Sequence, residues 1–208
     1  MAGGPVQLLA RRPRDARAAF RRELAGDRYL RLLDDRDAEE LYELIDRNRD
    51  HLARWLPWAG THTLEATVEL IRGTRRQLAE NDGFQAGIAR GERLVGVAGF
   101  HSVQWGHRAT SIGYWLAEAE QGRGTMTLAV GALVDHAFDE WGLNRVEIRA
   151  ATDNRRSRAV AERLGFRLEG VLREAERVGD RFLDNAVYSM LAGERTRSIS
   201  SRLRSPKK

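Results

Sequence analysis

Cysteine is absent from this 208-residue sequence, which excludes disulfide bonds and zinc sites with thiolate ligands. The absence of cysteine also agrees with a cytoplasmic protein. No apolar run approaches the roughly 20 residues that a membrane-spanning helix requires. The arginines near the N-terminus are not followed by an apolar stretch, so we expect no secretory signal peptide. The five histidines show no metal-ligand spacing, so we expect no metal site.

The composition is that of a folded globular protein, with 42% hydrophobic and 31% charged residues. Its net charge of +5 is unevenly distributed. Residues 1–26 carry six arginines against two acidic residues, and residues 194–208 carry six basic residues against one glutamate. We therefore expect a basic N-terminal extension, a mildly acidic domain over 27–193 and a basic C-terminal tail. Such tails bind RNA or ribosomal surfaces in some proteins and are solvated ends without a specific role in others.

Segments of helical and strand periodicity alternate along the chain and predict a single mixed α/β domain. The expected strands cover residues 29–33, 84–90, 94–101, 109–116, 145–151, 166–173 and 182–191. The expected helices cover residues 38–47, 64–80, 124–141 and 154–164, and residues 14–24 are compatible with a short helix. Antiparallel hairpins thus come first, and a β-α-β-α-β unit follows.

A glycine-punctuated loop, Gln121-Gly122-Arg123-Gly124, lies between an expected strand and the long expected helix. Two glycines leave backbone N–H groups accessible, and the start of a helix adds unpaired N–H groups and the positive end of its dipole. This arrangement is suited to a phosphate or pyrophosphate group. Its spacing matches neither the dinucleotide fingerprint nor a P-loop, and the alternative is that the glycines are only turn residues.

A second polar segment, Thr152-Asp153-Asn154-Arg155-Arg156-Ser157, stands where an expected strand ends and a helix begins. Ligands of α/β sheets bind at the carboxyl ends of strands, so amide, guanidinium and hydroxyl groups here are candidates for binding. The alternative is helix capping, which we prefer for Asp153.

Together, Gln121-x-x-Gly124, Asn154-x-x-Ser157 and Leu164-Gly165-Phe166 resemble the GNAT acetyltransferase family over about residues 29–191. Within it, the chain most resembles the RimJ/RimL group of ribosomal-protein N-terminal acetyltransferases. The segments that carry this closer resemblance are 52–58, 112–116, 144–147 and 168–173. The resemblance implies a central, mostly antiparallel seven-stranded sheet, flanked by helices and splayed between the fourth and fifth strands, 109–116 and 145–151.

The resemblance implies acetyl-CoA as the co-substrate, lying between the two splayed strands, and no metal. Its pyrophosphate would contact the N–H groups of the glycine loop, and a backbone N–H near Leu116 would face the thioester carbonyl. The family prefers Gly or Ala where Met126 stands. The residues implied in cofactor binding are Leu116, Gln121, Gly122, Arg123, Gly124, Thr125, Met126, Asn154 and Arg156.

The resemblance also implies the catalytic groups. Many family members use a tyrosine to protonate the CoA thiolate, but the aligned residue here is Ala161. In the RimL group a serine at the position of Ser157 has that role, which leaves Ser157 as either the proton donor or a helix-start residue. The implied base is Glu176. Glu174 would share its face if the strand continued, and a surface glutamate paired with arginine is the alternative for Glu176.

A carboxylate base favours an easily deprotonated acceptor. An α-amino group has a pKa of about 8 and lysine one of about 10.4, so an N-terminal amine is the expected acceptor, as in a ribosomal protein. Trp55 and Trp58 are candidates for the acceptor wall or for the core. The alternatives are acetylation of a small amine, such as a polyamine or an aminoglycoside-like antibiotic, and a non-catalytic acyl-CoA-binding regulator with RNA-docking tails. The resemblance also allows a homodimer and weak RNA or ribosome contacts through the tails, without membrane association.

Overall fold

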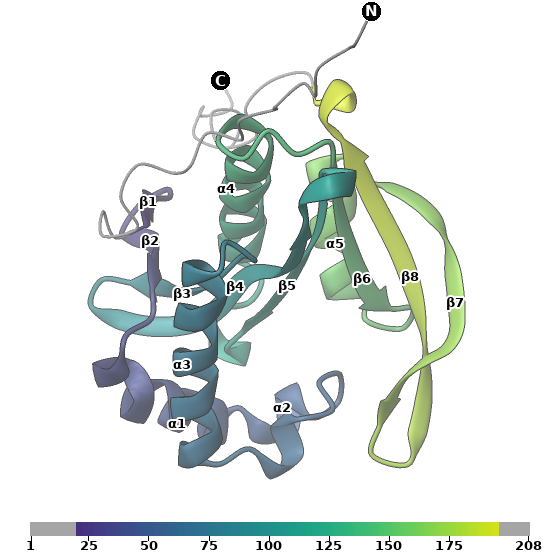
Figure 1. Cartoon of the computed structure of the whole chain (residues 1–208). Coiled ribbons are helices and arrows are strands. Elements are labelled where there is room, and N and C mark those ends of the chain that lie inside the picture. Colours follow the sequence, from purple (N-terminus) through teal and green to yellow (C-terminus); the bar gives the residue numbers. More distant parts are fainter. Residues whose placement is uncertain (1–19, 196–208) are drawn as a thin grey trace, which may run out of the picture.

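An eight-stranded mixed sheet forms the centre of the computed structural model, which describes residues 20–195 (Figure 1). The strand order is β1-β2-β3-β4-β5-β6-β8-β7, and every neighbouring pair is antiparallel except β5 and β6, which are parallel. The strands are β1 (Arg21–Glu23), β2 (Arg28–Leu32), β3 (Gln85–Arg90), β4 (Arg93–Gln104), β5 (Ala109–Leu116), β6 (Arg145–Ala151), β7 (Arg167–Val178) and β8 (Arg181–Leu191). The helices are α1 (Ala38–Arg47), α2 (Arg49–Leu52), α3 (Leu64–Ala79), α4 (Thr125–Asp139) and α5 (Arg155–Leu164).

The predicted mixed α/β fold is confirmed, with a correction to the number of strands. The sequence predicts seven strands, and the structure adds β1 where a short helix is expected. Phe20 and Leu24, on either side of β1, contact the main core and hold this segment against the free edge of β2. The greater part of the predicted basic extension and of the basic tail lies outside the described residues.

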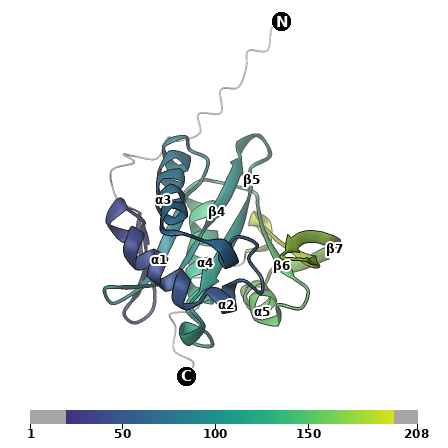
Figure 2. The same cartoon turned by 90° about the horizontal axis from the view of Figure 1, so that it is seen from below.

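Helices cover both faces of the sheet: α1 and α3 lie on one face, and α4 and α5 on the other (Figure 1, Figure 2). On the first face, Leu41 and Ile45 of α1 share an apolar cluster with Val97 of β4. On the second face, Leu133 of α4 shares the larger cluster with Ile148 of β6. Burial of these two apolar surfaces is the main stabilising contribution to the fold.

Local sequence explains where α1 begins. Asp34 accepts a hydrogen bond from the N–H of Arg36, and the carboxylate of Asp37 accepts one from the N–H of Asp34, which forms a capping box just before the helix. The bounds of α1, residues 38–47, coincide with those predicted.

The central helix α4 is buried on most sides, with 11 of its 15 residues buried. A helix that is apolar around most of its circumference packs within the core, and α4 contacts β4 and β5 of the sheet and the neighbouring helix α5. Its first turn is therefore held firmly against the rest of the protein. Within residues 20–195, no helix is long and apolar enough to cross a membrane.

The parallel strands β5 and β6 pair only at their beginnings. Their register joins Ala109 to Arg145, Thr110 to Val146 and Ser111 to Glu147, and no pairing continues beyond Ser111 although β5 runs to Leu116. The two strands therefore separate toward their carboxyl ends, where α4 and α5 begin. The predicted splay between 109–116 and 145–151 is confirmed, and both strands have the predicted bounds.

Candidate functional site

The loop that enters α4 depends on two glycines in the left-handed region. Gly122 has φ 74° and Gly124 has φ 75°, and Gly124 is the N-cap of α4. No atom lies within 4 Å of where a Cβ would stand at either position, so the backbone conformation, and not space, selects glycine here. The N–H groups of the first turn of α4 have no partner within the helix, so they are available to an anion.

Two of the predicted cofactor residues have buried side chains. Thr125 is 1% exposed, and Met126 is 8% exposed within the main core cluster. Neither side chain is therefore placed to contact a bound molecule. Met126 stands where the family prefers a small residue, and its side chain is accommodated because it packs into the main core cluster.

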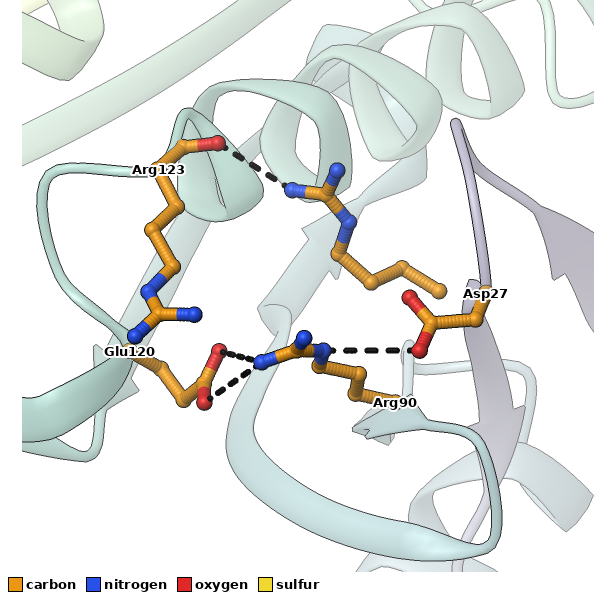
Figure 3. Close-up of a pocket in the computed structure, with 5 residues that line it drawn as sticks. Asp27, Arg90, Glu120 and Arg123 are labelled. Carbon is orange, nitrogen blue, oxygen red and sulfur yellow. Dashed lines mark hydrogen bonds and ion pairs between the residues drawn. The ribbon is translucent and has the colours of Figure 1, made fainter.

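Arg28 of β2 holds the loop from the outside. Its Nη1 donates to the carbonyl oxygen of Arg123 at 3.1 Å and to Oγ1 of Thr125 at 3.0 Å. Figure 3 shows the surrounding hollow, where Arg90 lies between the carboxylates of Glu120 and Asp27. Arg28 could not be found from the sequence, because it lies 95 residues from Arg123 and belongs to no motif.

Gln121 joins three elements of the fold. Its Oε1 accepts from Nη1 of Arg156 on α5 at 2.5 Å, and its Nε2 lies 2.7 Å from Nε2 of His51 on α2. Because Oε1 of Gln121 accepts from Arg156, Nε2 of Gln121 is the amide nitrogen and donates to His51. Nε2 of His51 must then be the acceptor, so a neutral His51 carries its proton on Nδ1. Nδ1 lies 3.7 Å from Oε1 of Glu118. Burial lowers the pKa of His51, against an opposing effect of Glu118, so the neutral form fits this network.

The backbone at the end of β5 presents an N–H to the space between the splayed strands. Ala117 donates its N–H to the carbonyl of Val95 on β4. Hydrogen-bonding groups alternate along an antiparallel strand, so the N–H of Leu116 points away from β4, toward β6. At this point β6 no longer pairs with β5, so β6 does not take up the N–H of Leu116.

Asn154 and Ser157 form the start of α5. Asn154 is the N-cap, and its Oδ1 accepts from the N–H of Ser157 at 3.1 Å. The hydroxyl of Ser157 lies 3.2 Å from the phenolic oxygen of Tyr114, which itself donates to the carbonyl of Ser157 at 3.1 Å. Burial raises the pKa of Tyr114 to about 12, so its phenol stays protonated. The contact of Tyr114 with Ser157 could not be found from the sequence, because Tyr114 is a strand residue 43 positions away.

A bulge interrupts β7 before Glu176. Leu172 pairs with Asn185, but the next pair is Glu176 with Leu183, so three residues of β7 oppose a single residue of β8. Glu174, within the bulge, has φ 49°. The shared face expected for Glu174 and Glu176 on an uninterrupted strand is lost, because the bulge breaks the alternation of side chains.

The two glutamates consequently have different surroundings. Glu174 is exposed, and its N–H donates to Oδ1 of Asp184 at 2.8 Å. Glu176 is half-buried, and its Oε2 accepts from Nδ2 of Asn185 at 3.2 Å. Of the two, Glu176 has the carboxylate that a neighbouring side chain holds.

The aromatic segment after α2 lies beside the end of β5. Trp58 is 36% exposed, and the centroid of its ring lies 6.4 Å from that of Trp115, the neighbour of Leu116 in β5. Trp55 is half-buried. Arg181, at the start of β8, donates to the carbonyl of Arg54 at 3.3 Å, which brings the β7–β8 hairpin against this segment.

The chain is similar in sequence to known acetyltransferases. The family described as acetyltransferase (GNAT) domain matches residues 28–167. The putative ribosomal N-acetyltransferase YdaF of Bacillus subtilis is 40% identical over 167 residues, which cover 79% of this chain and 91% of the relative. The ribosomal-protein-serine acetyltransferase of Escherichia coli is 32% identical over 152 residues, which cover 73% of this chain and 85% of the relative.

The structure is similar to a solved structure of the same kind. This is RimL, a ribosomal L7/L12 alpha-N-protein acetyltransferase, in complex with coenzyme A. It superimposes with a TM-score of 0.80 at 26% sequence identity, covering 85% of this chain and all of the other.

Proposed function

The chain belongs to the GNAT acetyltransferase family, and from this premise we propose that this acetyl-CoA-dependent N-acetyltransferase acetylates the N-terminal α-amine of a ribosomal protein. The observation that carries the proposal is the separation of β5 from β6 beside the glycine loop at the start of α4. The names of the relatives, a ribosomal-protein-serine acetyltransferase and RimL, support a protein N-terminus as the acceptor.

Acetyl-CoA is proposed to lie between β5 and β6, with its pyrophosphate on the glycine loop. The pyrophosphate would be contacted by the backbone N–H groups of Gly122, Arg123, Gly124, Thr125 and Met126. The side chains of Thr125 and Met126 are buried. Gln121, Asn154 and Arg156 would border the same space from the loop and from α5, consistent with the contact between Arg156 and Gln121.

The proposed chemistry is direct transfer in a ternary complex, with bound acetyl-CoA supplying an activated thioester. The N–H of Leu116 donates to the thioester oxygen as negative charge develops on it. Glu176 takes the proton released when the amine bonds to the acetyl carbon. Ser157 turns its hydroxyl from Tyr114 toward the sulfur that leaves, gives it the proton, and is then reprotonated from solvent.

An α-amine suits this set of groups better than a lysine side chain. With a pKa of about 8, an α-amino group is neutral far more often at pH 7 than a lysine with a pKa of about 10.4. A single half-buried carboxylate then needs only to remove the proton released during transfer. Trp55 and Trp58 are proposed to form the wall against which the first residues of the acceptor pack, as the contact of Trp58 with Trp115 suggests.

The test is thiol release from acetyl-CoA with a panel of acceptors. Short peptides with free Ser or Ala N-termini are compared with the same peptides after N-terminal acetylation, with polyamines and with aminoglycosides. We expect release with the free peptides alone. Release with only the small amines would overturn the acceptor assignment, and saturable acetyl-CoA binding without release from any acceptor would overturn catalysis in favour of a binding role.

A further inference from the structure

Asn185 is a buried polar residue at the part of the sheet where the proposed chemistry takes place. It belongs to β8 and pairs with Ala151, the last residue of β6, and with Leu172 of β7. It therefore stands at the carboxyl end of β6, beyond the point where β5 and β6 have separated. The residue is only 7% exposed.

The amide of Asn185 is satisfied on one side only. Its Nδ2 donates to Oε2 of Glu176 at 3.2 Å. A carboxylate accepts hydrogen bonds and does not donate them, so the nitrogen, and not the oxygen, must face Glu176. The oxygen Oδ1 is then left buried without a hydrogen-bond partner among residues 20–195.

A purely structural role does not account for this arrangement. A buried carbonyl without a partner destabilises the folded state, and a leucine, which has the same branching at Cγ and no polar side-chain atom, would avoid that cost. The contact that the amide does make is to the carboxylate of Glu176. The preceding residue of β8, Asp184, accepts from the N–H of Glu174 in the bulge, so two consecutive residues of β8 fix the local geometry around Glu176.

We propose that Asn185 is a positioning residue, which holds the carboxylate of Glu176 in the orientation needed to take the proton from the acceptor amine. This inference rests on the proposed function, because it acts through Glu176. Asn185 itself does not contact the reacting atoms. Its removal should therefore lower turnover while leaving the affinity for acetyl-CoA unchanged.

The experiment compares Asn185→Leu, Glu176→Gln and the double variant in the full-length chain. The measurements are kcat with a Ser-headed peptide, the dissociation constant of acetyl-CoA, and Tm. We expect Asn185→Leu to lower kcat about tenfold, as loss of a hydrogen bond to a charged group would. We expect its Tm to stay level or rise, because the unpaired oxygen is gone. A structural role would lower kcat and Tm together.

Ser189→Ala is the matched control. Ser189 is also buried on β8, and its hydroxyl donates at 2.6 Å to Glu169, another glutamate of β7. We expect no change in kcat for this variant. If Asn185→Leu fails to fold, Asn185→Asp keeps the size of the side chain, cannot donate when ionised, and is expected to lower kcat at least as much.

The double variant separates this inference from the proposed function. If Asn185 acts through Glu176, the double variant has the same kcat as Glu176→Gln. Two results would overturn the inference and leave the assignment of Glu176 standing. One is a kcat in the double variant that is lowered by the product of the two single effects. The other is full turnover in Asn185→Leu while Glu176→Gln is slow. Full turnover in Glu176→Gln would overturn the assignment of the base, and the positioning role with it.

Discussion

Tyr114 and Ser157 form two hydrogen bonds to each other across the space between β5 and α5. The hydroxyl of Ser157 donates to the phenolic oxygen at 3.2 Å, and the phenol donates to the carbonyl of Ser157 at 3.1 Å. Because burial raises the pKa of Tyr114 to about 12, the phenol keeps its proton throughout the physiological range. The orientation of the Ser157 hydroxyl is thus set by a strand residue as well as by its own helix.

The first prediction concerns this pair. Ser157→Ala should lower kcat by roughly 100-fold if its hydroxyl is the proton donor, and Tyr114→Phe should lower kcat by about fivefold through loss of orientation. Tyr188→Phe is the control, because its phenol also contacts α5, through Arg158 and Glu162. Steady-state kinetics with a peptide acceptor checks all three variants. Full turnover in Ser157→Ala would show that Ser157 is only a residue of the helix start and not the proton donor.

The second prediction concerns the glycine loop. Gly124→Ala should destabilise the fold by about 1 kcal/mol, because a side chain disfavours the left-handed conformation, and it should also weaken acetyl-CoA binding. Gly142→Ala is the matched control, since Gly142 has φ 63° and likewise has no atom within 4 Å of a Cβ. Thermal unfolding should show similar losses, whereas calorimetry should show weaker binding for Gly124→Ala alone. Equal affinities in the two variants would contradict a role for this loop in binding.

The third prediction concerns Arg28, which holds the loop through the Arg123 carbonyl and Thr125. Arg28→Ala should raise the dissociation constant of acetyl-CoA about fivefold, because the N–H groups of the loop are then less well ordered. Arg36→Ala serves as the control, since Arg36 is 91% exposed and pairs only locally with Asp34. Unchanged binding by Arg28→Ala would mean that the loop keeps its conformation without this contact.

The fourth prediction concerns stability at low pH. Burial lowers the pKa of His136 to about 4, against an opposing effect of Glu140 and with a smaller lowering effect of Arg22. The ring packs against Phe84 and Trp141. Since the folded pKa is depressed, the unfolded chain binds a proton first, and stability falls as the pH drops from about 6.5 toward 4.

His136→Phe should remove this dependence. We expect the loss of unfolding free energy between pH 7.5 and pH 5 to be about 2 kcal/mol smaller in the variant than in the wild type. Urea unfolding at the two pH values measures the difference, and the comparison cancels the contributions of the other titrating groups. Identical losses in both proteins would show that His136 is not protonated on unfolding in this range.

Several elements follow from local sequence alone. The bounds of α1, β5 and β6 agree with those predicted, because apolar periodicity and the capping residues at Asp34 act within one or two turns of chain. The glycine loop is also predictable, since a left-handed backbone at Gly122 and Gly124 is a property of the loop itself. These features, with the family resemblance, were sufficient to predict the fold, and the cofactor site at the glycine loop stays a prediction.

The side-chain partners within the site were decided only by the tertiary structure. Arg28 meets the loop from 95 residues away, His51 meets Gln121 from 70 and Tyr114 meets Ser157 from 43. Such pairs depend on strand order and register, which no local pattern encodes. The bulge in β7 likewise depends on pairing with β8, and it separates Glu174 from Glu176. The sequence therefore determined which elements form and which loop takes a left-handed backbone, whereas the packing of distant strands determined which side chains contact the candidate catalytic groups.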